Sequence, residues 1–109
     1  MNEPTDQQLK DILTTAVVDG INYWATTRRH RPEEGSVSIY EVEDDFPNSP
    51  PIAKHEINMD KMWNAAKTYP EWAKLNLAAY IHTQEWDDFD SLAADCFIQY
   101  VCFKDVIYG

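Results

Sequence analysis

Hydrophobic residues recur at helical spacing near the start of the chain. Thr5 and Gln8 have the Thr-x-x-Gln form of a capping box, which closes the first turn of a helix. Gly20 can adopt the left-handed conformation in which helices often end. Between these points the apolar residues lie three and four apart: Leu9, Ile12, Leu13, Ala16 and Val17. The pattern predicts one amphipathic helix that ends at Gly20.

The pattern then changes to one that is typical of strands. Segments 21–27 and 36–42 are rich in β-branched and aromatic residues, and a Glu34-Gly35 turn lies between them. A weaker strand candidate spans 52–57, after a proline-rich loop at 44–51. Three consecutive strands with these connections favour an antiparallel meander.

Helical spacing returns in the second half of the chain. Asn58 is a predicted N-cap, and we expect Pro70 to break the helix that follows it. A further helix from about Pro70 to Gln84 has two apolar stripes, so we expect neighbours to cover it on more than one side. The last segment, 91–103, is apolar nearly all round and predicts a central buried helix.

These elements predict a single α+β domain over residues 1–109. A small three-stranded antiparallel sheet would pack against helices, with the C-terminal helix buried. A length of 109 residues, 44% hydrophobic residues and 26% charged residues are ordinary for one globular domain. No repeat or linker divides the chain.

The net charge of the chain indicates which kinds of partner it can bind. Nineteen acidic and nine basic residues give a formal net charge of −10. This charge repels phosphate backbones and anionic membranes, so we expect a host protein with a basic surface as partner, no direct nucleic-acid contact and no membrane. No apolar run approaches the roughly 20 residues of a membrane span, and the N-terminus has no secretion signal. We therefore expect a cytoplasmic protein.

Two acidic clusters are the candidate partner-binding site. The first contains Glu41, Glu43, Asp44, Asp45 and the aromatic Phe46, and the second contains Glu85, Trp86, Asp87, Asp88 and Asp90. Either they are solvated faces, or they imitate nucleic-acid phosphates while the aromatic residues anchor a basic groove of a target protein. Neither has the 12-residue pattern of a calcium loop.

A polar stripe crosses the apolar C-terminal segment, because Ser91, Asp95 and Gln99 are four residues apart. A buried carboxylate needs a partner, so Asp95 must reach solvent or meet a polar group inside the fold. The stripe is either a structural pair that fixes the helix or a ligand-binding or catalytic site. Candidate partners of Asp95 are Arg28, Arg29, Arg31 and His82.

The remaining chemistry favours no catalytic site. The chain has no phosphate-binding glycine loop and no metalloprotease or hydrolase motif, so we expect no enzyme, no cofactor and no metal. Cys96 and Cys102 are expected as buried reduced thiols, since six residues along a helix separate them. The run Arg28-Arg29-His30-Arg31 is expected in a solvated turn that neutralises nearby carboxylates, with a partner contact as the alternative.

Two motifs at the ends of the chain carry a resemblance. They are Gly-Ile-Asn-Tyr-Trp-Ala at 20–25 and a spaced C-terminal set: Ala94, Asp95, Gln99, Phe103, Ile107, Tyr108 and Gly109. Together they resemble an uncharacterised family of small bacteriophage and prophage proteins, which often has Gly where this chain has Lys104. The resemblance implies an origin in a mobile element and brings no activity with it.

Charge and resemblance together suggest a function. We expect a small acidic phage accessory protein that is not an enzyme and binds a host protein through its acidic aromatic surface. As a nucleic-acid mimic, it would inhibit a host defence or nucleic-acid-binding protein. The alternatives are a ligand-binding protein or enzyme that uses Asp95 and Gln99, and a homo-oligomeric structural or regulatory protein.

Overall fold

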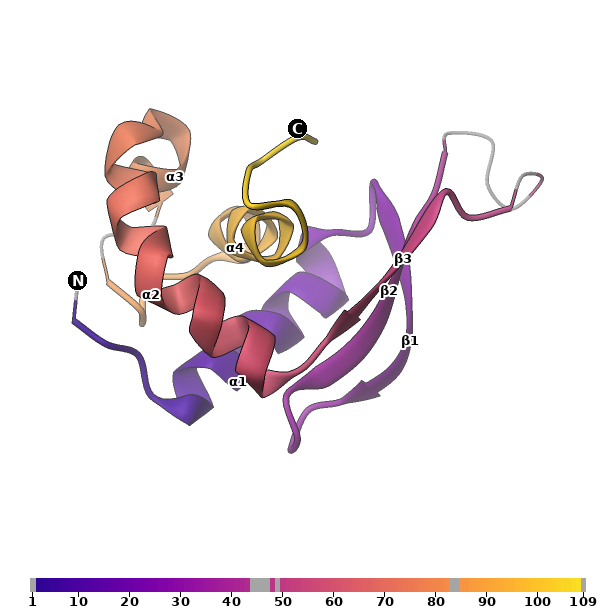
Figure 1. The fold of residues 1–109 in the computed structure, drawn as a ribbon, viewed down its shortest axis with the longest axis horizontal. Helices are drawn as coiled ribbons and strands as arrows, with labels where there is room; N and C mark the ends of the chain where they lie inside the picture. The colour runs from indigo at the N-terminus through magenta and orange to yellow at the C-terminus, as the bar shows by residue number, and fades with distance from the viewer. Residues whose placement is uncertain (1, 44–47, 49, 83–84, 109) are drawn as a thin grey trace.

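The computed structural model describes residues 2–43, 48, 50–82 and 85–108 of the chain. Its fold is α+β, with a three-stranded antiparallel sheet and helices packed on it, as the sequence predicts (Figure 1). In chain order the elements are α1 (Asp6–Thr15), the π-helical turn η1 (Ala16–Gly20), β1 (Ala25–Arg31), β2 (Ser36–Glu41), β3 (Ala53–Ile57), α2 (Met59–Leu75), α3 (Leu77–His82) and α4 (Ser91–Phe103).

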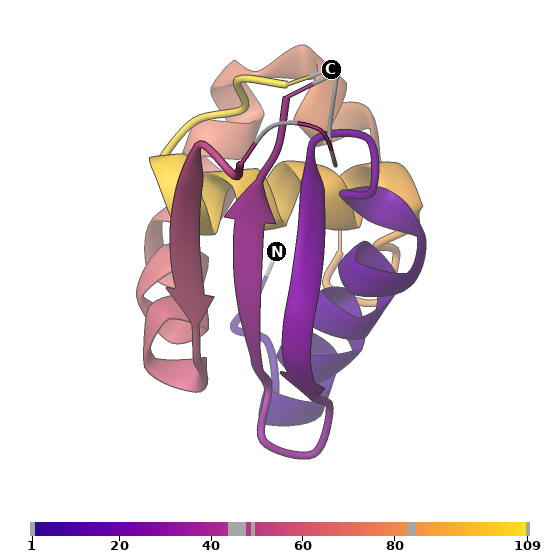
Figure 2. The same ribbon diagram turned by 90° about the vertical axis from the view of Figure 1, so that its right-hand side faces the viewer.

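The sheet is a meander in the order β1-β2-β3, and the helices cover one of its faces (Figure 2). In the register, Ile39 of β2 lies opposite Thr27 of β1 and His55 of β3. Gly35 turns the chain from β1 to β2 at φ +66°, a conformation that side chains other than glycine rarely adopt. Buried Val37 and Ile39 place the centre of β2 in the hydrophobic core.

The last helix, α4, is the central element of the core, as predicted. Phe97 and Ile98 are fully buried, and α4 crosses behind the sheet in Figure 2. The helix begins at the N-cap Asp90, whose Oδ1 accepts a hydrogen bond from the backbone N–H of Ala93 (2.8 Å). It ends at Lys104, which itself adopts the left-handed conformation at φ 61°. The closing turn is therefore made by a lysine, without a glycine at this position.

The first helix begins with the predicted capping box of Thr5 and Gln8, but its end differs from the prediction. The last turn widens into η1, and Gly20 is not left-handed. Gly20 instead allows η1 to lie against α4, because a Cβ at this position would stand 2.9 Å from the carbonyl oxygen of Ser91. Its role is close packing between two helical segments.

The first strand begins later than its sequence predicts. Residues 21–24 form a turn in which the N–H groups of Trp24 and Ala25 both donate to the carbonyl of Ile21 (3.0 Å each). This turn directs the indole of Trp24 into the core, where only 1% of it is exposed. Burial of these aromatic and branched residues therefore outweighs their preference for strand, and β1 continues to Arg31 instead.

The predicted break at Pro70 is wrong, since α2 runs through it to Leu75. Proline removes one backbone hydrogen bond, to the carbonyl four residues earlier, and usually kinks a helix. Here Tyr69 and Ala73, on either side of Pro70, are both buried, and the ring of Tyr69 packs edge-on against Phe97 of α4 (centroids 5.0 Å apart). Packing on α4 holds the helix together where local preference would end it.

Among the described residues, no helix is both long enough and apolar enough to cross a bilayer.

Candidate functional site

Asp95 lies inside the fold, 3% exposed, and its hydrogen-bond partners differ from the predicted ones. Its carboxylate accepts hydrogen bonds from the Tyr23 hydroxyl (2.5 Å), Trp24 Nε1 (2.9 Å) and Gln99 Nε2 (2.9 Å). Within the described residues these neutral donors, rather than an arginine, satisfy it; the His82 side chain lies outside that description. Burial and the bond to Asp95 raise the pKa of Tyr23 above its ordinary value.

Gln99, one turn further along α4, holds the C-terminal segment. Its Oε1 accepts hydrogen bonds from the backbone N–H groups of Ile107 and Tyr108 (2.8 Å each). Its Nε2 donates to Asp95 and to the carbonyl oxygen of Tyr108 (3.2 Å). The amide therefore joins α4 to the segment that follows it.

Tyr108 extends the network to the sheet. Its ring stacks on Trp24 with centroids 5.1 Å apart, and its hydroxyl donates to Glu41 Oε2 (2.6 Å). The other oxygen of Glu41 lies 2.7 Å from His55 Nε2 on β3. The bond to Glu41 raises the pKa of Tyr108 to about 12. The stripe residues Asp95 and Gln99 thus belong to a polar network that ties the turn at 21–24 and the C-terminal segment to α4 and the sheet, which favours the structural interpretation.

The first acidic cluster is only partly on the surface. Glu41 is buried within this network, whereas Glu43 is exposed. Asp44, Asp45 and Phe46 lie outside the described residues.

The second acidic cluster is exposed except for its aromatic residue. Glu85, Asp87 and Asp88 all face solvent, and Asp87 Oδ1 accepts a hydrogen bond from Gln8 Nε2 (2.6 Å). Trp86 is an interior residue with 4% exposure, stacked on Phe89 and bonded through its indole N–H to the carbonyl of Asn2. The prediction that it anchors a partner at the surface does not fit this position.

The two clusters lie apart. Glu41 contacts β3 and the C-terminal segment, while the second cluster contacts α1 and the N-terminal segment. In Figure 1 the end of β2 and the segment that enters α4 lie on different sides of the molecule. The described acidic residues therefore do not form one continuous face.

An exposed apolar surface adjoins the second cluster in sequence. The end of α2 and the short helix α3 expose four large side chains, which we call the α3 patch: Leu75, Leu77, Tyr80 and Ile81. Leu75 is 86% exposed and Leu77 is 71% exposed, so the expectation that neighbours cover both stripes of this region is wrong. The two predicted stripes indicated excess apolar surface, but they could not show that members of both stay exposed: Leu75 in one stripe and Leu77, Tyr80 and Ile81 in the other.

Comparisons of the chain with protein families, curated proteins and solved structures found no match. The resemblance to phage proteins therefore stays a prediction.

The cysteines and the basic run complete the candidate groups. Cys96 and Cys102 are free thiols, partly buried, and burial raises their pKa values to about 11 and about 12.

The basic run lies on strand β1, where Arg31 pairs with Glu34 (3.6 Å) and Arg28 stands over the ring of Tyr40. Among the described residues no group of three His, Cys, Asp or Glu is placed to hold a metal ion.

Proposed function

We propose that this chain is a non-enzymatic binding protein that docks a basic partner protein through the α3 patch and the second acidic cluster. The observation that carries the proposal is the exposure of four large apolar side chains within residues 75–81, which precede the acidic cluster at 85–90 in the sequence. Exposed large apolar side chains that gather in one region often mark interaction sites in soluble proteins.

The patch has the chemistry of an interface centre. Leucine, isoleucine and tyrosine side chains release water when a partner covers them, and tyrosine adds a hydroxyl for orientation. Tyr80 takes the anchoring position that the sequence assigned to Trp86. The exposed carboxylates of Glu85 and Asp88 would form a polar rim that attracts a positively charged partner.

Charge favours a different protein over a second copy of this chain as the partner. In a two-fold dimer the same patch meets itself, so the carboxylates of the proposed rim would approach one another. A net charge of −10 adds further repulsion between copies. A partner with a basic surface would be attracted by the same carboxylates.

The test compares variants in affinity capture from bacterial lysate, with captured proteins identified by mass spectrometry. Leu77→Ser should abolish capture of a basic protein, whereas Val18→Ser, at a site that is 68% exposed on η1, should not. Glu85→Lys with Asp88→Lys should slow association, and Glu33→Lys on the β1–β2 turn is the charge control. Salt at about 0.5 M should weaken the wild-type complex by screening.

Identical capture by the Leu77→Ser and wild-type proteins would refute the proposed surface. A wild-type dimer in size-exclusion chromatography that Leu77→Ser dissociates would replace the proposal with self-association. Competition of duplex DNA for the captured partner tests the narrower proposal, that the acidic cluster imitates nucleic acid to inhibit a host defence or nucleic-acid-binding protein. A partner that DNA does not displace would refute that mimicry and leave the protein-binding role intact.

A further inference from the structure

A basic cleft lies between β3, α2 and the end of α4, away from the α3 patch. Its volume is about 360 Å³, at the small end of the range of ligand pockets. The polar side chains that line it come from all three elements: Lys54, His55, Glu56, Lys61, Asn64 and Lys104. Lys61 and Lys104 therefore bring two of the chain's nine basic residues to this cleft of a strongly acidic protein, whereas the Lys54 ammonium lies over the ring of Tyr40 on the open face of the sheet.

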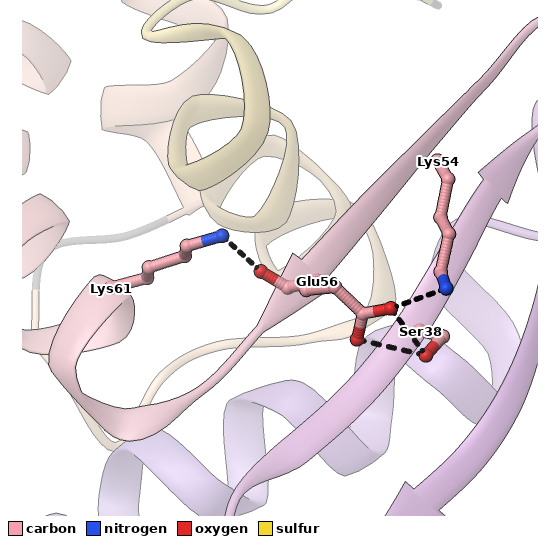
Figure 3. A network of polar contacts seen from close by, with 4 residues as sticks. All are labelled: Ser38, Lys54, Glu56 and Lys61. Atoms are coloured by element: carbon pink, nitrogen blue, oxygen red, sulfur yellow. Dashed lines mark hydrogen bonds and ion pairs between the residues drawn. The ribbon is translucent and has the colours of Figure 1, made fainter.

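Only part of this positive charge is neutralised within the fold. Lys54 Nζ lies 2.8 Å from the carboxylate of Glu56, which also accepts hydrogen bonds from Ser38 (Figure 3). Lys61, on the other side of Glu56 in this view, donates to its backbone carbonyl oxygen (2.6 Å).

Lys104 Nζ stands 5.5 Å from the centroid of the Tyr100 ring. Among the described residues neither Lys61 nor Lys104 has a carboxylate ion pair within 4 Å. Among the described groups at the cleft, Lys61 and Lys104 carry two positive charges, and the Glu41 carboxylate that is bonded to His55 offsets one of them.

We propose that this cleft binds a small phosphate-bearing molecule. Lysine ammonium groups bind phosphate oxygens as point charges, and the Asn64 amide adds a neutral donor at the same cleft. The proposal is independent of the α3 patch, since it uses other residues, on β3, at the start of α2 and at the end of α4.

The size of the ligand follows from the distribution of charge. Surface charges are screened over about 8 Å at physiological ionic strength, so a small anion in the cleft responds to the nearby lysines. A nucleic-acid backbone extends far beyond the cleft and meets the net charge of −10 on the rest of the molecule. The cleft therefore selects a compact phosphate compound over a nucleic acid.

The test is a titration of the ¹⁵N-labelled full chain with sodium pyrophosphate at constant ionic strength, followed by NMR. Saturable shifts should be confined to amides of 54–57, 61–64 and 101–104. Lys61→Gln with Lys104→Gln should weaken binding about tenfold or more, and Lys104→Gln alone should weaken it by less. Glu56→Gln should change binding little, because the Glu56 carboxylate pairs with Lys54 on the open face of the sheet. Lys74→Gln, an exposed lysine at the other end of α2, is the matched control.

If the shifts do not saturate up to about 10 mM pyrophosphate, the proposal is overturned. A dissociation constant above this concentration corresponds to a binding free energy weaker than about 3 kcal/mol. Equal affinity in the double variant, or an equal loss in Lys74→Gln, would also overturn it, since the effect would not come from the cleft. Shifts of the same amides by a short DNA duplex at lower concentration than pyrophosphate would overturn the assignment to a small ligand.

Discussion

At the scale of single residues, the buried polar groups of α4 are explained by partners far away in the sequence. The spacing of Asp95 and Gln99 showed that they share a face of a buried helix, which the structure confirms. Their partners could not be found from sequence, because Tyr23 and Trp24 look like strand residues and become donors only through the turn at 21–24. Arginine was the reasonable expectation for a carboxylate, but the neutral donors of Tyr23, Trp24 and Gln99 satisfy it.

Replacement of the Asp95 carboxylate tests this network. Asp95→Asn keeps the shape but replaces one acceptor oxygen by a donor, which then faces donors from Tyr23 and Trp24. We expect the free energy of unfolding in urea to fall by about 1–3 kcal/mol. Asp19→Asn, at an exposed position on η1, should change it little. Equal stability of the two variants would contradict the network.

The pH dependence of stability tests Tyr108. Its pKa rises from 10.0 to about 12 in the folded chain, because its hydroxyl donates to Glu41. The unfolded tyrosine ionises first, so its stabilising contribution is complete below pH 10.0 and is lost as the pH rises to about 12. In urea unfolding from about pH 9 to 12, the stability difference between wild type and Tyr108→Phe should therefore shrink. Tyr80→Phe is the control, and a constant difference for Tyr108→Phe would exclude this linkage.

At the scale of elements, local signals predicted where most helices and strands lie, and tertiary packing decided their ends. The capping box of α1 and the N-cap of α2 are local devices, and both are present. The end of α1, the start of β1 and the continuity of α2 depend on contacts with α4 and the core. These contacts join residues far apart in sequence, so periodicity could not reveal them.

The continuity of α2 through Pro70 predicts that replacing this proline with alanine stabilises the protein. Pro70→Ala restores a backbone N–H that can donate to the carbonyl of Ala66 and removes the clash of the ring with that turn. We expect the free energy of unfolding to rise by about 1–3 kcal/mol, with helical circular dichroism equal to or above that of the wild type. Ala73→Gly in the same helix should have the opposite sign. A loss of stability in Pro70→Ala would mean that the fold requires the proline at this position.

At the scale of the whole molecule, the fold class followed from sequence and the candidate surface did not. An amphipathic pattern in the sequence shows which residues of a helix are apolar. Whether an apolar residue faces the core or the solvent depends on how the helices pack. Trp86 and Leu77 illustrate the point, because the tryptophan beside the acidic residues is covered and the leucine in a helix is 71% exposed. The proposed binding face therefore shifts from Trp86 to the α3 patch, while its acidic rim stays as the sequence suggested.

The most direct test of this account is site-specific photo-crosslinking. A benzoylphenylalanine at position 77 lies in the α3 patch, and one at position 18 lies on an equally open apolar site of η1. In bacterial lysate, position 77 should form a covalent adduct with a basic protein, and position 18 should form none with that protein. Adducts of equal yield at both positions, or an adduct of position 77 with a second copy of this chain, would contradict the proposed interface.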